Sequence, residues 1–190
     1  MTSLANVATL DFGDPIPATV KEAADLRSRG ADAIVVIAHM GGRCTDLREP
    51  TDVSSCDKKQ EAYEFLSRLP PGTIDAYFAG HTHSEMRQII NGVPTLQAGA
   101  YSRGFSTLDL WVDPAGHRVL SDRTSLRPLT MICESVYSGT TLCDARTAAK
   151  GGSLVPREFE GAVVKRDAHI DDMLRPYLCL LYTSPSPRDS

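Results

Sequence analysis

The stretch "ADAIVVIAHMGG", residues 31–42, decides how the fold is interpreted. Its centre is continuously apolar and rich in β-branched residues, which is typical of a strand buried on both faces of a parallel sheet. The run ends at His39, and two glycines follow. A second stretch, "TIDAYFAGHTHSE" at residues 73–85, has the same design, because a short apolar run ends in glycine and then His81 and His83. Both predicted strands therefore end in histidines.

A helical segment precedes each predicted strand. "DPIPATVKEAADLRSRG" has Pro17 at a first helical position and Gly30 at a C-terminal stop. "SCDKKQEAYEFLSRLPPG" predicts a second helix that is capped by Ser55 or Asp57. Helix, strand, loop, helix and strand in this order predict an α/β protein with a parallel α/β unit.

The second half of the chain has a different pattern. Asn91-Gly92 between two apolar runs predicts a β-hairpin, and "FSTLDLWVDPAGHRVL" alternates like a half-buried strand. We therefore expect an antiparallel strand meander after the parallel unit. The predicted divisions are 1–125 for the α/β unit and meander, 126–166 for a loosely structured extension, 167–178 for the start of a helix, and 179–190 for a disordered tail. The tail resembles a translated sequencing adapter, so we expect it to be non-native.

Composition excludes some classes of function. The 190 residues fit one domain with a real core, and the formal net charge of −4 predicts no nucleic-acid partner. The longest apolar runs are too short to cross a bilayer, and the first residues contain no export signal.

Four of the five cysteines form two local pairs. A disulfide between Cys44 and Cys56, or between Cys133 and Cys143, would close a short polar loop in an oxidising compartment. The alternative is four reduced thiols in a cytosolic protein, because connectivity does not follow from spacing.

The histidines at the strand ends carry the functional prediction. Neutral imidazoles are common ligands of transition metals, and a glycine before His81 permits a sharp turn. His39 follows the strand that we expect to lie nearby, so His39, His81 and His83 are predicted to meet at a metal. His117 and His169 lie in polar surroundings and are expected to be solvated.

"IVVIAHMGG", then "IDAYFAGHTHSE", then "INGVPTLQAGAYSRGFSTLDLWVD" together resemble the calcineurin-like metallophosphoesterases, and within them the 5′-nucleotidase branch. The likeness covers residues 5–125 and, loosely, 160–178, where "DAHIDDMLRPYL" resembles the start of an interdomain helix. It implies that the chain is a partial metallophosphoesterase sandwich, namely the C-terminal half of the catalytic domain.

The resemblance also implies a chemistry. The complete enzyme would hydrolyse phosphate monoesters, in particular nucleoside 5′-monophosphates, with a hydroxide bound between two divalent ions of the Zn, Mn, Co or Fe class. His39 and His81 would bind one ion and His83 the other, while Gly41, Gly42 and Gly80 would shape the loops and Thr82 would reach a group behind the ligands. Members of the family are commonly exported, so the resemblance also implies a periplasmic or extracellular location.

The sequence departs from the family in what it lacks. The Asp-x-His, Gly-Asp and Gly-Asn-His-(Asp/Glu) motifs of the first half are not recognised ahead of the histidine-bearing strands, because the pair Gly13-Asp14 lies directly before the first predicted helix, where the family has an ordinary lead-in. The substrate domain is not recognised either. The catalytic residues are therefore expected outside this chain, which by itself should bind metal weakly and hydrolyse little. The alternatives are a small non-catalytic protein that binds one metal with the same histidines and a purely structural domain.

Overall fold

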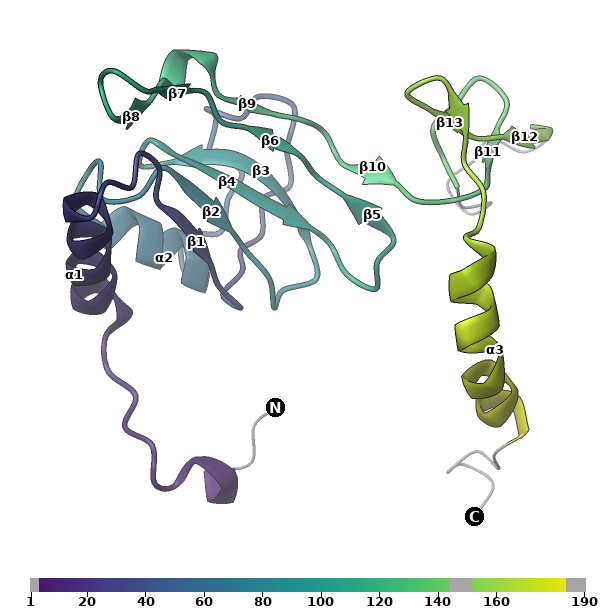
Figure 1. Ribbon diagram of the computed structural model, residues 1–190, viewed down its shortest axis with the longest axis horizontal. Coiled ribbons are helices and arrows are strands. Elements are labelled where there is room, and N and C mark those ends of the chain that lie inside the picture. The colour runs from purple at the N-terminus through teal and green to yellow at the C-terminus, as the bar shows by residue number, and fades with distance from the viewer. Residues whose placement is uncertain (1–3, 144–151, 184–190) are drawn as a thin grey trace. The chain divides into compact units, whose positions relative to one another are not determined.

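The structure is a computed structural model that describes residues 4–143 and 152–183. It is a mixed α/β protein, and the chain divides into two compact units, Met1–Thr130 and Met131–Ser190 (Figure 1). The histidines that follow the two predicted strands belong to the first unit.

A four-stranded sheet forms the centre of the first unit. Its strands are β1 (Val35–Ile37), β2 (Ala76–Phe78), β3 (Glu85–Ile90) and β4 (Val93–Ala98), in the spatial order β1-β2-β4-β3. β1, β2 and β4 run parallel, whereas β3 is antiparallel to β4. The carboxyl ends of the three parallel strands therefore meet at one edge of the sheet.

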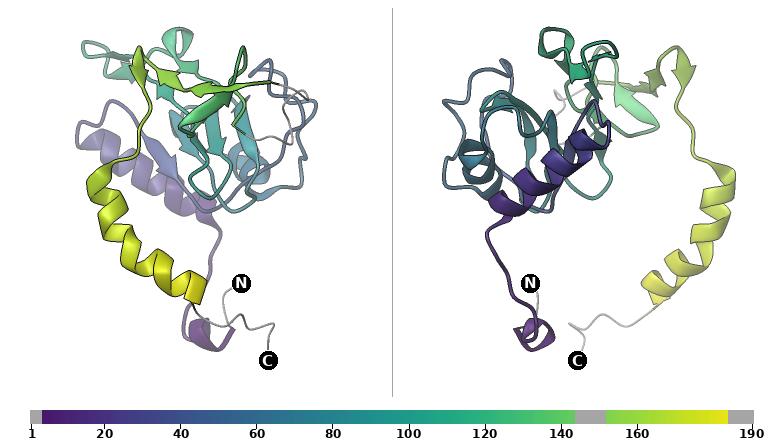
Figure 2. Two further views of the ribbon diagram at one scale, coloured as in Figure 1. Left: turned by 90° about the vertical axis from the view of Figure 1, so that its right-hand side faces the viewer. Right: turned by 60° about the vertical axis from the view of Figure 1, so that its left-hand side comes forward.

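Two helices pack beside this sheet, as Figures 1 and 2 show. They are α1 (Pro15–Ser28) and α2 (Glu61–Arg68). Ala23 of α1 and both Phe65 and Leu66 of α2 are buried in one apolar cluster with Tyr77 and Met86 of the sheet. Burial of these side chains supplies most of the driving force that holds the helices on the sheet.

The helix boundaries differ from the prediction at both N-termini. α1 starts at Pro15, two residues before Pro17, because the Asp14 side chain caps it by accepting a hydrogen bond from the Ile16 amide at 3.0 Å. α2 starts only at Glu61, so the predicted caps at Ser55 and Asp57 are wrong.

The cause of the late start is the disulfide between Cys44 and Cys56. The same two residues form a β-bridge, which keeps the chain extended where a helix would otherwise begin. The Asp57 carboxylate instead accepts hydrogen bonds in a turn, from the Lys59 amide and from the Gln60 side chain.

The predicted hairpin is confirmed. β3 and β4 pair from Glu85 with Ala98 to Ile90 with Val93, and the turn residues Asn91 and Gly92 have φ angles of 50° and 78°. Positive φ at both central residues is the geometry that Asn-Gly favours in a two-residue hairpin.

The rest of the first unit is a series of short elements. The stretch 105–120 is expected to turn between Asp113 and Gly116 into a second strand, and β7 and β8 do pair antiparallel about a turn there, while β6 pairs antiparallel with β9. The elements are η1 (Leu4–Val7), β5 (Gly104–Phe105), β6 (Leu108–Asp109), β7 (Val112–Asp113), β8 (Arg118–Val119), η2 (Ser121–Arg123) and β9 (Ser125–Leu126), with β10 (Thr130–Met131) at the boundary between the units.

The second unit contains two short hairpins and a helix. The strands are β11 (Ser135–Tyr137), β12 (Leu154–Pro156), β13 (Glu158–Phe159) and β14 (Ala162–Val163), and the helix is α3 (Ala168–Thr183). A disulfide joins Cys133 to Cys143. α3 continues beyond residue 178, where the predicted tail begins, and residues 184–190 of that tail lie outside the described residues.

The prediction that β1 is buried on both faces is wrong. Val36 packs against the core, but Val35 and Ile37 on the opposite face are 43% and 82% exposed. A continuous apolar run is buried on both faces only where something covers each face, and no described residue shields this side of Ile37. β1 is also the edge strand of the sheet.

No helix among the described residues is long and apolar enough to cross a membrane. This agrees with the short apolar runs of the sequence.

We expect Asp75 to be a main polar anchor of the first unit. Its Oδ2 accepts hydrogen bonds from the Arg27 side chain at 2.7 Å and from the Ile34 amide at 2.6 Å, and so joins α1 to the starts of β1 and β2. Replacing Asp75 by Ala should lower the free energy of unfolding in urea by roughly 1.5–3 kcal/mol, because two charge-assisted bonds are lost at a part-buried site.

The matched control is Asp25→Ala, which removes an exposed pair with Arg29 on the outside of α1. It should cost about 0.5 kcal/mol or less. Equal losses in the two variants would show that Asp75 has no special role.

Candidate metal centre

All three predicted ligands lie at the carboxyl edge of the parallel strands. His39 follows β1, and His81 and His83 follow β2. The ladder continues almost to the histidines, because the Ala38 amide donates to the Phe78 carbonyl at 3.0 Å and the Ala79 amide donates to the Leu96 carbonyl at 2.9 Å. The histidines are thus carried on the ends of paired strands, where open α/β sheets place their ligand sites.

The structure brings two of the three imidazoles together. The ring centroids of His39 and His81 are 5.0 Å apart, and the rings are nearly perpendicular at 78°. A transition metal bound at about 2.0–2.1 Å from an imidazole nitrogen allows two rings on one ion to have centroids up to roughly 6 Å apart. The His39–His81 pair therefore fits two ligands of one ion.

The ring of His83 lies against a different neighbour. It contacts Tyr101, with centroids 5.2 Å apart and an interplanar angle of 72°. Within residues 4–143 and 152–183, no three His, Cys, Asp or Glu side chains are grouped closely enough to hold a metal by themselves. His39 and His81 therefore fit part of a metal site, and further ligands would have to come from outside the described residues.

The backbone of the GHTH segment is strained. His81 and His83 have φ angles of 76° and 54°, in the left-handed region that side chains with a Cβ seldom adopt. The Thr82 amide donates to the Gly80 carbonyl at 2.9 Å, which makes a γ-turn centred on His81, a rare turn for a residue other than glycine. Such conformations persist only where neighbouring structure enforces them, and they cluster at functional sites.

A part-buried hydrogen-bond network enforces this turn. The Thr82 hydroxyl donates to the Gly42 carbonyl at 2.8 Å and accepts from Nε2 of Gln97 at 2.9 Å. The Ser84 hydroxyl donates to the same Gly42 carbonyl. Gln97 is buried on β4, so the network ties the loops after β1 and β2 to a rigid strand.

Gly41 allows the two histidine loops to touch. A Cβ at Gly41 would lie 2.0 Å from the Gly80 carbonyl oxygen and 2.5 Å from the Thr82 hydroxyl. Only glycine fits this close approach of two backbones. The expected loop-shaping role therefore has a direct structural basis for Gly41.

The loop after His39 has a second anchor. The buried Tyr77 hydroxyl donates to the Met40 carbonyl at 2.9 Å, and burial raises the pKa of Tyr77 above its usual range. The phenol therefore stays a neutral donor and fixes the backbone next to His39.

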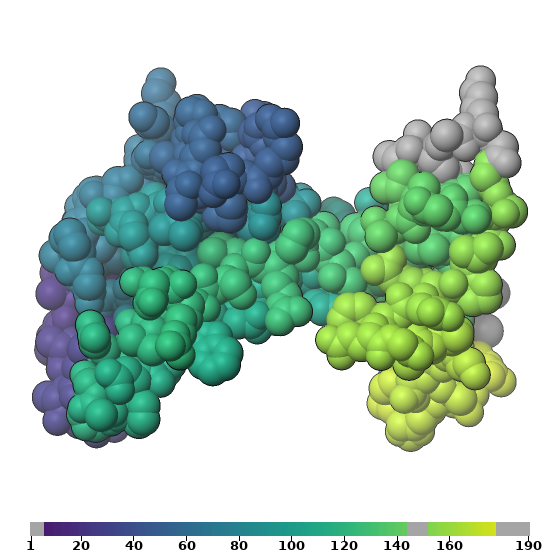
Figure 3. Space-filling view, turned by 90° about the horizontal axis from the view of Figure 1, so that it is seen from above, coloured from purple at the N-terminus to yellow at the C-terminus, as the bar shows by residue number. Residues whose placement is uncertain are grey.

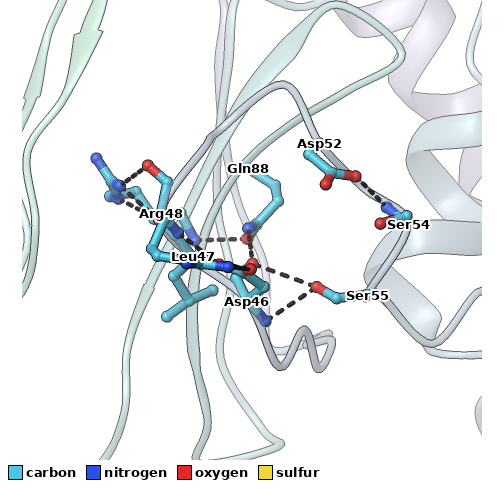
Figure 4. Close-up of polar contacts among 8 residues, drawn as sticks. Asp46, Leu47, Arg48, Asp52, Ser54, Ser55 and Gln88 are labelled. Carbon is cyan, nitrogen blue, oxygen red and sulfur yellow. Dashed lines mark hydrogen bonds and ion pairs between the residues drawn. The ribbon is translucent and has the colours of Figure 1, made fainter.

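Residues 43–57 form a disulfide-closed loop between β1 and α2, which stands out as a lobe of the surface (Figure 3). Gln88 of β3 donates to the Asp46 carbonyl at 3.0 Å, and the Ser55 hydroxyl donates to the same oxygen at 3.2 Å (Figure 4). The Arg48 guanidinium binds both carboxylate oxygens of Asp46. The loop is therefore held both by its own polar contacts and by a side chain of β3.

Sequence reasoning missed Gln97, Tyr77 and Tyr101. Gln97 and Tyr77 lie within strands and look like ordinary strand residues in the sequence. Only the register of the strands shows that both side chains contact the loops that carry the histidines. His117 and His169 are exposed, as expected. His117 also contacts Asp32, with 2.6 Å between Nδ1 and Oδ1.

Comparison with known proteins gives distant relatives. No family model matches the chain. The chain is 27% identical over 116 residues to Endonuclease YhcR of Bacillus subtilis, a match that covers 56% of this chain and 8% of the relative. It is 26% identical over 151 residues to the cell wall protein Lmo0130 of Listeria monocytogenes, covering 71% of this chain and 19% of the relative. The chain thus spans less than a fifth of either curated relative.

We expect Gly41→Ala to disrupt the centre. The added Cβ would collide with the Gly80 backbone, which has no flexible side chain to move aside, so the two loops must separate. The free energy of unfolding in urea should fall by roughly 1–3 kcal/mol, in the range of overpacked core substitutions. Gly13→Ala is the control, because no atom lies within 4 Å of a Cβ there, and it should change stability little.

The loop 43–57 should make stability depend on acid pH. Hydrogen bonds from the Arg48 side chain and amide lower the pKa of Asp46 from 3.8 to about 2. A carboxylate with a lowered pKa stabilises the fold above its unfolded value, and that stabilisation is lost as pH falls from about 4 through about 2. Urea midpoints measured across this window should fall less steeply in Asp46→Asn, and identical slopes would contradict the assignment.

Proposed function

We propose that the first unit carries one half of a dinuclear metal-dependent phosphoesterase centre, which in its complete form hydrolyses phosphate monoesters, in particular nucleoside 5′-monophosphates. The observation that carries the proposal is the His39–His81 pair, with 5.0 Å between ring centroids, on a γ-turn at the carboxyl edge of the parallel strands. A strained turn that is enforced by a part-buried hydrogen-bond network is costly for a protein that needs only a loop there.

The proposed roles follow from these positions. His39 and His81 would hold one divalent ion, and His83, two residues after His81, would bind the second. When bound, such ions act as Lewis acids that activate water and neutralise phosphoryl oxygens. The chain's own residues fix the imidazoles: Gln97 and Thr82 set the turn, and Tyr77 sets the backbone beside His39.

The missing ligands are proposed to come from a second half of the sandwich. β1 is an edge strand, and the exposed Val35 and Ile37 leave an apolar face beside it. Exposed apolar edges attract another strand or layer. A segment docked there would bring carboxylates to the histidine edge and complete the partial metallophosphoesterase sandwich.

Small monoesters are the favoured substrate class. A net charge of −4 gives little attraction for a polyanion, which argues against a nucleic-acid substrate even though the Bacillus relative is named an endonuclease. We also infer an extracellular or periplasmic location, supported by the two disulfides and by the cell wall protein among the relatives.

A second candidate function is a non-catalytic protein that binds a single metal. The observation that favours it is that the described residues hold two imidazoles together and no third ligand beside them. Hydrolysis separates the candidates, because only the first predicts turnover of nucleoside 5′-monophosphates once a carboxylate-bearing half is joined to this chain.

Metal uptake by the full chain tests the shared premise. Equilibrium dialysis with Zn²⁺ or Mn²⁺ should show binding that falls roughly tenfold or more in His39→Ala and His81→Ala, since even residues behind metal ligands typically cost 10–100-fold. His169→Ala, an exposed histidine of the second unit, is the control and should bind as the native chain does. Equal uptake by all four proteins would remove the metal from the proposal.

A further inference from the structure

The turn after β4 carries an unusual pair of residues. Tyr101 and Ser102 have φ angles of 61° and 52°, so two successive residues with side chains lie in the left-handed region. Tyr101 is 78% exposed, and no burial of its ring explains the conformation. Because β4 is parallel to β2, this turn lies at the same sheet edge as the histidines. The Gly99 amide also donates to the Ser84 carbonyl at 3.2 Å and ties the turn to the GHTH segment.

The Tyr101 ring joins a predicted metal ligand to a cation. It packs edge-on against His83, with centroids 5.2 Å apart, and the Arg103 guanidinium carbon lies 5.7 Å from its centroid. The His83 ring centroid and the Arg103 guanidinium carbon are therefore no more than about 11 Å apart, and the Arg103–Tyr101 contact is a cation–π arrangement.

The charge of Arg103 is uncompensated in the part of the chain that the structure describes. Several arginines of the first unit bind carboxylates, such as Arg27 with Asp75 and Arg127 with Asp109, whereas others, Arg123 among them, form no ion pair in the described ranges. Arg103 forms no ion pair with any residue in the described ranges, and it is exposed. A guanidinium beside a cationic centre is repelled unless an anion binds between them.

We propose that Arg103 is the phosphate-binding residue of this centre and that Tyr101 is the positioning residue that aims it. The inference rests on the proposed function, and it assigns to a residue of this chain the recognition of the phosphoryl group. The planar fork of a guanidinium matches two phosphoryl oxygens, and such bonds are about 2.7–2.9 Å long. The upper limit of about 11 Å between the His83 ring and the Arg103 guanidinium is short enough for a phosphate at the histidine edge to lie within reach of both.

The test is calorimetric titration of the full chain, loaded with Zn²⁺, with inorganic phosphate. Arg103→Ala should weaken phosphate binding roughly tenfold or more and leave Zn²⁺ uptake unchanged. Arg103→Lys should bind phosphate with intermediate affinity, since the charge is kept and the fork is lost. Tyr101→Phe should bind as the native chain does, whereas Tyr101→Ala should lose affinity because the ring that aims Arg103 is gone.

Arg123→Ala is the matched control. Arg123 is an exposed arginine of η2 without an ion pair in the described ranges, and its neighbours Ser121 and Thr124 line a pocket with Asn91 and Val93, at the end of β4 away from the histidines. Native affinity in this variant together with the loss in Arg103→Ala supports the inference.

The contrary outcomes are distinct. If Zn²⁺ binds through the histidines and phosphate binds equally well to Arg103→Ala, the inference is overturned while the proposed function stands. If Zn²⁺ uptake does not depend on His39 or His81, the proposed function fails and this inference fails with it.

Discussion

The close approach of two backbones at Gly41 and Gly80 is the constraint on which the rest depends. Because Gly41 has no side chain, the loop after β1 contacts the loop after β2 directly. The ring centroids of His39 and His81, one in each loop, are 5.0 Å apart. Without that approach, the Thr82 hydroxyl could not reach the Gly42 carbonyl, and the strained turn at His81 would relax. A contact between backbones thus places the imidazoles.

The centre is built in layers from the sheet outward. β4 supplies the buried Gln97, which fixes Thr82, and β2 supplies the buried Tyr77, which fixes Met40. Both Gln97 and Tyr77 lie on strands and not in the loops that they hold. The sheet therefore fixes the positions of the exposed imidazoles. This explains how three exposed histidines can have defined positions without burial of their own.

Much of this arrangement is readable in the sequence. The two apolar runs that end in histidines predict both strands, and Asn91-Gly92 predicts the hairpin that places β4 beside β2. The strain at His81 and the contacts of Gln97 could not be predicted, because they depend on how separate segments meet. The exposure of Ile37 could not be predicted either, since an apolar run does not say what covers it.

The central claim is that His39 and His81 ligate the same ion. X-ray absorption at the zinc edge, measured on the full chain with substoichiometric Zn²⁺, tests it directly, because imidazole rings give a characteristic outer-shell scattering. The account predicts two imidazoles per zinc at about 2.0 Å, with oxygen ligands completing the shell. A shell of oxygen alone, or a single imidazole, would contradict it.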